Sequence, residues 1–269
     1  MTPAVPKLDA QRLESLNQLA PVPLSAPLTD KLARSRAVLH ALLAAFDPAR
    51  VAVAYTGGKD SGVALFLYRE ALSRAGIAPL LARSAPKAIS ALKAISIDTG
   101  CKFPQVMEFR DRLCADWGVD LTIARPGLDL AAYPVAQDKV ACCRDLKIAP
   151  LYAALRDTDT GALITGIRRD EHPSRTSRQY AELRAAITDG GATCPEHWQV
   201  NPILDWTEMD IWSFITGENL PFCELYHEGY RSLGCVPCTR PAGADAGERA
   251  GRDPDKERQL EILKGLGYF

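Results

Sequence analysis

A short glycine-containing run, between a predicted buried strand and a predicted helix, is where this sequence first suggests chemistry. The run consists of Thr56, Gly57, Gly58, Lys59, Asp60, Ser61 and Gly62. Its glycines let backbone N–H groups face an anion, and the start of the following helix adds partial positive charge. Lys59 offers a mobile cation, Ser61 a hydroxyl, and Asp60 a carboxylate suited to Mg²⁺ or to capping the loop. The pattern predicts a phosphate-binding loop; the simpler alternative is a tight turn with chance polar residues.

Cysteines form the second chemical pattern. Cys142 and Cys143 are adjacent, and Cys235 and Cys238 form a Cys-x-x-Cys pair that begins 92 residues after Cys143. Two such pairs can hold zinc or an iron–sulfur cluster. Adjacent cysteines are awkward zinc ligands because neighbouring side chains diverge, although the start of a helix there could aim both inward. We expect a metal centre; the alternative is two buried thiols and an incidental loop pair.

Arginines gather after a later predicted strand. They are Arg168, Arg169, Arg175 and Arg178. Guanidinium groups suit phosphate or sulfate oxygens because they bind them through two parallel hydrogen bonds. We expect Arg168 and Arg169 to take part in an anion site, with a solvated charged loop as the alternative. His172, within the same run, is a candidate acid–base group or anion contact.

Several single residues allow two interpretations each. Asp98, at the end of a predicted strand, contacts ribose or a metal ion, or caps a turn. Cys101 is a thiol beside the nucleotide or a small buried residue, and Cys194 approaches the site only if its loop moves. Cys114 and Cys223 lie in apolar settings that favour packing.

Strands and helices alternate along most of the chain. Predicted strands cover residues 51–55, 94–98, 120–124 and 162–166, and predicted helices cover residues 29–46, 61–75, 104–117 and 143–155. This alternation predicts an α/β fold with a doubly wound parallel sheet, which binds ligands at the carboxyl ends of its strands. Thr207 opens a further short helix with a capping box, in which Asp210 takes the place of the usual Glu or Gln.

Three segments are expected from the composition. Residues 1–28 form a Pro-rich arm, residues 29–241 a nucleotide-binding domain with the cysteine site, and residues 242–269 a C-terminal tail. Residues 78–93, rich in Ala, Pro and Lys, are interpreted as an insertion between a helix and a strand.

Charge and hydropathy exclude several classes of protein. Hydrophobic residues make up 47% of the chain and charged residues 24%, which is ordinary for a globular protein. The formal charge of −1 predicts no nonspecific attraction to nucleic acid or to anionic membranes. We expect no membrane span and a cytoplasmic location, where eight cysteines are unusual unless several bind metal or react.

The motifs resemble a known family. The glycine-rich loop resembles the Ser-Gly-Gly-Lys-Asp-Ser loop of the ATP pyrophosphatases, with Thr56 in place of the first serine. From about residue 50 to residue 241 the sequence resembles the adenylyl-sulfate and phosphoadenylyl-sulfate reductases. The matching motifs are residues 97–100, 109–111, 142–151, 165–169, 200–203 and 229–241.

The resemblance implies an adenine nucleotide alpha-hydrolase (PP-loop) fold that binds ATP with Mg²⁺, and a [4Fe–4S] cluster. The implied cluster ligands are Cys142, Cys143, Cys235 and Cys238, with Lys147 nearby to tune the charge. The residues expected to contact the nucleotide are Thr56, Gly57, Gly58, Gly62, Asp98, Lys147 and Arg240. Those expected to take part in the chemistry are Lys59, Asp60, Ser61, Arg168 and Arg169.

Two departures from the reductases bear on function. Their mobile tail carries a nucleophilic cysteine, whereas no cysteine follows Cys238 in this sequence. They also lack the loop lysine that this chain keeps as Lys59. The small subunit of bacterial sulfate adenylyltransferase is similar in having a loop lysine and an ending Gly-Tyr-Phe, but it lacks the four cysteines.

The leading hypothesis is therefore an ATP-dependent adenylyl transferase of sulfur metabolism, which cleaves ATP between the α and β phosphates and activates an unknown acceptor. A reductase of adenylyl sulfate or its 3′-phosphorylated form, using Cys101, Cys194 or a partner's thiol, is the second. A non-catalytic nucleotide- or redox-sensing subunit is the third. Expected partners are a sulfur or electron donor or a GTPase-type subunit, in a homo-oligomer; a nucleic-acid acceptor stays open.

Overall fold

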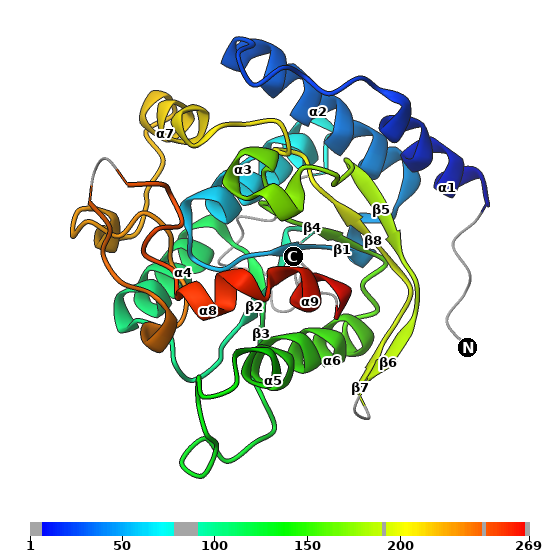
Figure 1. The fold of residues 1–269 in the computed structure, drawn as a ribbon. Helices are drawn as coiled ribbons and strands as arrows, with labels where there is room; N and C mark the ends of the chain where they lie inside the picture. The colour runs from blue at the N-terminus through cyan, green and yellow to red at the C-terminus, as the bar shows by residue number, and fades with distance from the viewer. Residues whose placement is uncertain (1–6, 78–90, 190–191, 244–245, 267–269) are drawn as a thin grey trace.

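A six-stranded sheet forms the centre of the computed structural model, which describes residues 7–77, 91–189, 192–243 and 246–266 (Figure 1). Its strands lie in the order β3 (Asp120–Ala124), β2 (Lys93–Ile97), β1 (Val51–Ala54), β4 (Ala162–Ile164), β8 (His197–Val200) and β5 (Ala181–Arg184). Neighbouring strands are parallel except for β5, which is antiparallel to β8. The predicted α/β fold with a mostly parallel sheet is confirmed.

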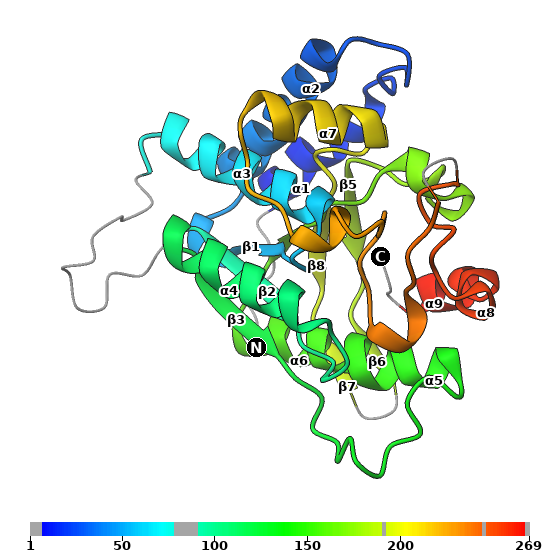
Figure 2. The same cartoon turned by 90° about the vertical axis from the view of Figure 1, so that its left-hand side faces the viewer.

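The central strand β1 explains how helices come to cover both faces. All four of its residues are buried. Val51 and Val53 belong to the larger core, with residues of α2 (Leu28–Ala45), α3 (Lys59–Arg74), α4 (Pro104–Trp117) and α7 (Glu208–Gly217). Ala52 and Ala54 face the opposite side, against α6 (Ala149–Asp157). Because side chains alternate along a strand, one buried strand supplies both cores, with α2, α3 and α7 on one side and α6 on the other (Figures 1 and 2).

The expected Pro-rich arm is helical in part. Helix α1 (Lys7–Glu14) is followed by a 3₁₀ turn (Ser15–Gln18), and Leu13 and Leu16 are buried in the larger core. The Asn17 side chain donates to the carbonyl of Ala181 at 2.6 Å and accepts from its N–H at 3.1 Å. These bonds satisfy backbone groups on β5, the last strand of the sheet. Residues 1–6 of the expected arm lie outside the described residues.

The helix around the adjacent cysteines differs from the prediction. It was expected to open at Cys142 and Cys143, but α5 (Lys139–Cys143) begins three residues earlier, where the side chain of Asp138 accepts from the N–H groups of Val140 and Ala141. A five-residue π-helical segment (Arg144–Ile148) then leads into α6. Pro150 lacks an N–H, so the normal helical bond to Leu146 cannot form there, which favours the wider turn.

Other predicted boundaries can be compared directly. Helix α4 begins and ends at the predicted residues, and the predicted strands match β1 to β4 within two residues at each end. Four short strands were missed, namely β5, β8 and the hairpin of β6 (Ile187–Asp189) with β7 (Ala192–Cys194). Two short helices, α8 (Pro254–Arg258) and α9 (Leu260–Gly265), lie within the expected tail segment. Of the expected insertion, residues 78–90 lie outside the described residues.

The capping box of α7 is confirmed and has a second function. The N–H of Asp210 donates to Thr207 Oγ1 at 3.1 Å, and Asp210 Oδ2 accepts from the Thr207 N–H at 2.7 Å. The same oxygen lies 2.6 Å from Nζ of Lys31, whose side chain is fully buried. Within the described residues, no helix is both long and apolar enough to cross a membrane.

We predict that Asp210→Asn lowers the free energy of unfolding by about 3 kcal/mol, because it leaves the buried Lys31 ammonium without its carboxylate. Thr207→Ala, which removes only the cap, should cost about 1 kcal/mol. The bonds of Asp210 with Lys31 and Thr207 outweigh its burial and lower its pKa. The destabilisation by Asp210→Asn should therefore shrink as the pH falls through that lowered pKa, where the wild-type carboxyl is itself protonated. Urea unfolding at several pH values measures both effects, and equal costs for the two variants would contradict the role given to Lys31.

Candidate active site

The glycine-rich loop leaves the carboxyl end of β1 and enters α3, as predicted. Gly57 has φ of 79°, and a Cβ there would lie 2.8 Å from Cγ1 of Val106. Gly166, just after β4, comes so close to the loop that a Cβ would lie 2.8 Å from the backbone of Asp60 and Ser61. The two glycines therefore let α4 and the end of β4 press the loop into one conformation.

Hydrogen bonds within the loop fix its shape. Ser61 Oγ donates to the carbonyl of Gly58 at 3.0 Å and accepts from the N–H of Thr56 at 3.2 Å. The N–H of Gly58 points to Thr56 Oγ1 at 3.3 Å, so the threonine hydroxyl caps the turn. The N–H of Lys59 donates to the Tyr226 hydroxyl at 2.9 Å. The backbone N–H groups of Gly58 and Lys59, which were expected to face a phosphate, thus already have hydrogen-bond partners.

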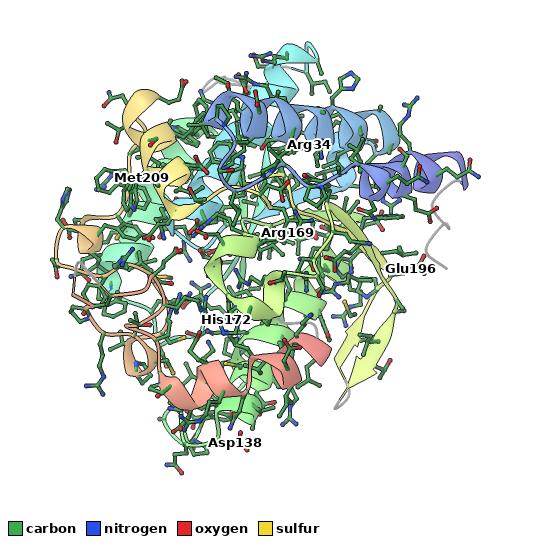
Figure 3. All side chains as sticks on the ribbon, turned by 45° about the horizontal axis from the view of Figure 1, so that its top comes forward. Arg34, Asp138, Arg169, His172, Glu196 and Met209 are labelled. Carbon is green, nitrogen blue, oxygen red and sulfur yellow. The ribbon has the colours of Figure 1, made fainter. Side chains whose placement is uncertain are left out.

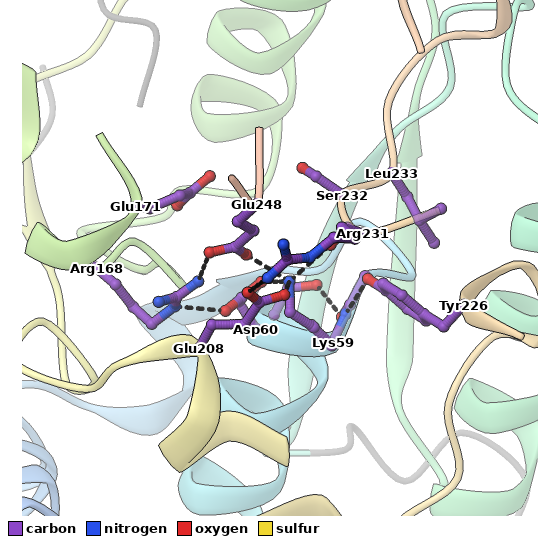
Figure 4. A network of polar contacts seen from close by, with 12 residues as sticks. Lys59, Asp60, Arg168, Glu171, Glu208, Tyr226, Arg231, Ser232, Leu233 and Glu248 are labelled. Carbon is purple, nitrogen blue, oxygen red and sulfur yellow. Dashed lines mark hydrogen bonds and ion pairs between the residues drawn. The ribbon is translucent and has the colours of Figure 1, made fainter. Parts of the chain in front are cut away.

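Lys59 and Arg168 meet at one carboxylate (Figure 4). Nζ of Lys59 lies 2.5 Å from Oε1 of Glu248 and 3.3 Å from Oδ2 of Asp60, and donates to the carbonyl of Arg231 at 3.0 Å. The Arg168 guanidinium bonds Asp60 Oδ1 at 2.7 Å through Nε and Glu248 Oε2 at 2.5 Å through Nη2. The lysine side chain is 1% exposed and the arginine side chain is fully buried.

Ionisation follows from these contacts. Burial alone would raise the pKa of Asp60, but the charges of Lys59 and Arg168 outweigh it and lower the pKa to about 2. Burial alone would lower the pKa of Lys59, but Asp60, Tyr226 and Glu248 outweigh it, so its pKa is raised. Burial and the nearby charge of Asp60 raise the pKa of Glu248 above its usual value.

A cavity of about 150 Å³ opens beside the loop. Thr56, Gly58 and Ser61 form one wall. Its other lining residues include five cations, namely Lys102, Lys147, Arg175, Arg249 and Arg252. This arrangement suits an anion more extended than one phosphate, because the positive groups line the space from the loop to Lys147. Lys59 and Arg168 are not among the described residues that line it.

The four predicted metal-ligating cysteines lie on two segments beyond that cavity. Cys142 and Cys143 end α5, whereas Cys235 and Cys238 flank a short turn. Cys235 and Cys238 lie close enough to Cys142 to raise its pKa, and Cys235 also raises the pKa of Cys238. Burial alone would also raise the pKa of Cys235, but Lys147 and Lys102 outweigh it and lower the pKa to about 6. The turn therefore holds a thiol that is readily ionised, beside the cations of the cavity.

A single metal ion does not fit these positions. In the part of the chain that the structure describes, no three His, Cys, Asp or Glu side chains are arranged to hold one ion. An iron–sulfur cluster sets its thiolates around a cube of iron and sulfide, farther apart than around one ion. Four lysines influence the ionisation of Cys235 or Cys238, namely Lys102, Lys139, Lys147 and Lys256, and their charge suits an anionic cluster.

The structure brings Arg168 but not Arg169 to the loop. Arg168 has an extended backbone, so the next side chain points the opposite way. Arg169 pairs with Asp205, donates to the carbonyl of Arg178 at 2.8 Å, and lies over the Tyr180 ring, as does Arg34 (Figure 3). These contacts hold Arg169 away from the loop, and they do not support its expected role in the chemistry.

Asp98 and Arg240 also lie apart from the lining of the cavity. Asp98 accepts from the N–H of Gly100 at 3.0 Å and pairs with Arg125 at 3.1 Å, so it caps the turn. Arg240 is exposed, and its N–H donates to the carbonyl of Gly251 at 2.8 Å. Their contacts with a nucleotide remain predictions that this arrangement does not support.

The remaining candidates are two thiols and a histidine. Cys194 is buried and lines a separate cavity next to α6, and burial raises its pKa to about 12. Cys101 is partly buried and accepts, through its carbonyl, the N–H of Val236 at 2.8 Å. His172 accepts from the N–H of Ser174 at 3.1 Å and caps a turn (Figure 3). Cys101 is thus the one of these three that adjoins the cysteine site.

Comparison with known proteins shows the family to which this chain belongs. Residues 50–241 match the family model described as the phosphoadenosine phosphosulfate reductase domain. The chain belongs to this family. The match covers the loop, Arg168 and all four cysteines of the predicted metal site, so the resemblance inferred from the motifs is confirmed.

The relatives with similar sequences are named as reductases of two related sulfonucleotides. The adenosine 5′-phosphosulfate reductase of Neisseria meningitidis is 39% identical over 122 residues, which are 45% of this chain and 46% of that protein. The phosphoadenosine 5′-phosphosulfate reductase of Xylella fastidiosa is 29% identical over 197 residues, 70% of this chain and 77% of that protein. The alignment with the first relative spans about half of its length.

Solved structures establish the fold. An FMN adenylyltransferase from Candida glabrata, in complex with FAD and pyrophosphate, has a TM-score of 0.63 and 20% identity, covering 97% of this chain and 88% of that one. A phosphoadenylyl-sulfate reductase from Candida auris has a TM-score of 0.59 and 17% identity, covering 89% of this chain and all of that one. The same fold thus occurs in proteins with both names.

Sequence reasoning missed the residues that follow the family match. Glu248 binds Lys59 and Arg168, and Arg249 and Arg252 line the cavity, although residues 242–269 were interpreted as a tail. Arg252 donates to Ser232 Oγ at 2.9 Å, and a Cβ on Gly234 would lie 1.9 Å from its Nη1. The charged run from Glu248 to Arg252 in a Gly- and Ala-rich segment was the available signal.

We predict that Lys102→Met weakens the binding of AMP by about 10- to 100-fold, the range for losing one charge-assisted hydrogen bond. Arg240→Met removes a charge from an exposed position outside the cavity lining and serves as the control, with unchanged affinity expected. Isothermal titration of both variants checks the assignment. A larger loss for Arg240→Met would mean that the nucleotide binds elsewhere.

Proposed function

We propose that this chain binds adenylyl sulfate or its 3′-phosphorylated form and takes part in its thiol-dependent reduction to sulfite. The supporting observation is the distribution of cations. Lys102, Lys147 and Arg252 line a cavity that runs from the phosphate loop to Gly234, beside Cys235. Lys59 and Arg168, which bind Glu248, are not among the described residues that line it. A nucleotide with its phosphate at the loop would direct a sulfonate toward the cysteines.

The reaction balances with two thiols. One thiolate attacks the sulfur of the sulfonate; a sulfur–sulfur bond forms, and the sulfur–oxygen bond to AMP breaks, with AMP leaving as the anion. A second thiolate then attacks the thiol sulfur of that adduct, and sulfite leaves with the electron pair. Two thiols are oxidised to a disulfide, while the substrate sulfur is reduced by two electrons. The cations of the cavity would stabilise the charge on AMP.

The thiols come from a dithiol donor in this proposal, with a partner protein as the source. If a thiol of this chain formed the sulfur–sulfur bond with the substrate, Cys101 would be the best placed, since it adjoins the turn that carries Cys235. Burial raises the pKa of both thiols, but Cys194 lines the other cavity and is therefore unsuited. Activity with an external dithiol alone is therefore expected.

A [4Fe–4S] cluster is proposed for Cys142, Cys143, Cys235 and Cys238. The donor set fits, since Cys143, Cys235 and Cys238 are buried and Cys142 is partly buried, beside the same lysines that lower the pKa of Cys235. A bound cluster would supply a fixed charge near the sulfonate end of the cavity and a covalent link between the two segments. Lys147, 9% exposed, lines the cavity and lies close to the thiol of Cys235.

Adenylyl transfer from ATP–Mg²⁺ is the second candidate. The observation that favours it is Lys59 itself, at the loop position where a cation would offset the charge of departing pyrophosphate. In the described structure that ammonium contacts Asp60 and Glu248 instead. This candidate therefore requires a rearrangement that the first does not.

Iron content tests the cluster. Protein purified without oxygen should contain about four irons per chain and show iron–sulfur absorbance. Cys143→Ser should lose the iron, whereas Cys114→Ser, a matched change at a buried cysteine of α4, should keep it. Zinc in place of iron in the wild-type protein would refute the assignment.

Lys59→Ala separates the two enzyme proposals. In a reductase it should lower sulfite formation from adenylyl sulfate much less than it lowers pyrophosphate release in an ATP-cleaving enzyme, because adenylyl sulfate carries no pyrophosphate. In an ATP-cleaving enzyme it should lower pyrophosphate release by about two orders of magnitude, the scale for losing one charge-stabilising group. Parallel anaerobic assays with a dithiol and adenylyl sulfate, and with ATP, Mg²⁺ and sulfate, provide the measurement. Pyrophosphate release in the wild type without sulfite formation would overturn the reductase proposal.

A further inference from the structure

The carboxylate of Glu248 lies beside the phosphate loop and contacts two cations, as a bound phosphate would. Its two oxygens contact different cations, Oε1 with Lys59 and Oε2 with Arg168, at 2.5 Å each. The side chain is 9% exposed and comes from a segment beyond the family match, which ends at residue 241. One internal carboxylate thus bridges the two cations that a polyphosphate chain would need (Figure 4).

The charges at this point are balanced without any nucleotide. Lys59 and Arg168 contribute two positive charges, and Asp60 and Glu248 contribute two negative ones. A further carboxylate, Glu208, lies 3.8 Å from Nζ of Lys59. Asp170 adds another, 3.4 Å from Nη1 of Arg168. Binding pyrophosphate here would add negative charge to a buried group in which every positive charge is already matched, which is unfavourable without release of a carboxylate.

The segment that carries Glu248 is anchored by the two arginines that follow it, Arg249 and Arg252. Arg249 forms ion pairs with Glu171 at 2.5 Å and with Glu257 at 2.7 Å. Arg252 donates to Ser232 and to the carbonyl of Leu233. Displacing Glu248 would disturb these contacts as well, so the carboxylate competes effectively with an incoming anion.

We propose that Glu248 is a specificity-determining residue that occupies the anion position on Lys59 and Arg168 and so excludes pyrophosphate and the β and γ phosphates of ATP. The open cavity then accepts adenine nucleotides that end in a single phosphate or a phosphosulfate. The substrate class rests on the function proposed above, but the exclusion itself is a property of binding. It is measured without turnover, so the two proposals can fail separately.

Binding of inorganic pyrophosphate to the whole chain, by isothermal titration, tests this role. Glu248→Ala and Glu248→Gln should each bind pyrophosphate about 10- to 100-fold more tightly than the wild type, because a buried cation pair regains a charge-assisted partner. AMP serves as the reference ligand, and its affinity should not rise as that of pyrophosphate does. Glu70→Gln is the matched control: Glu70 also bridges two arginines, Arg36 and Arg74, but lies toward the far end of α3.

Each outcome decides the matter. Tighter pyrophosphate binding in the Glu248 variants but not in Glu70→Gln supports the role. Unchanged binding in folded Glu248 variants overturns it, as does an equal gain in the control. Glu248→Gln keeps an oxygen acceptor and similar volume should Glu248→Ala fail to fold. Micromolar or tighter pyrophosphate binding by the wild type would overturn the proposal without any variant.

Discussion

The four-membered group of Lys59, Asp60, Arg168 and Glu248 is the interaction on which this site depends. Its members come from the start of α3, the segment after β4, and the chain beyond the family match. Buried charges are tolerated only when each has a partner, so the three segments must come together for any one of them to hold its position. The group thereby fixes the phosphate loop and brings Arg249 and Arg252 over the cavity.

Gly166 and Gly234 show how backbone packing makes this arrangement possible. At Gly166 the end of β4 touches the loop, and at Gly234 the guanidinium of Arg252 takes the space of a side chain. The second glycine directly precedes Cys235, so the arginine that lines the cavity also packs against the turn that carries two of the cysteines. The nucleotide cavity and the cysteine site therefore share a wall. A substitution that moves this wall on one side should also alter the geometry on the other side.

Local signals were predictable from the sequence, and long-range ones were not. The loop, helix α4 and the capping box of Thr207 and Asp210 depend on neighbours within a few residues, so pattern and residue type sufficed. Glu248 meets Lys59 across 189 residues, and no local pattern records such a pairing. Arg169 was expected beside Arg168, but side-chain direction in an extended segment separates them. Strands β5 and β8 were missed because Glu182, Arg184, His197 and Gln199 interrupt the apolar pattern.

Asn17 has a consequence for how molecules of this protein meet one another. Its side-chain amide forms hydrogen bonds with both the N–H and the carbonyl of Ala181, as the backbone of a neighbouring strand would. An uncovered strand at this border would offer the same two groups to a strand of a second molecule, which is how sheets join end to end in aggregates. At this one residue the Asn17 side chain thus takes the hydrogen-bonding position that a strand of a second molecule would otherwise occupy.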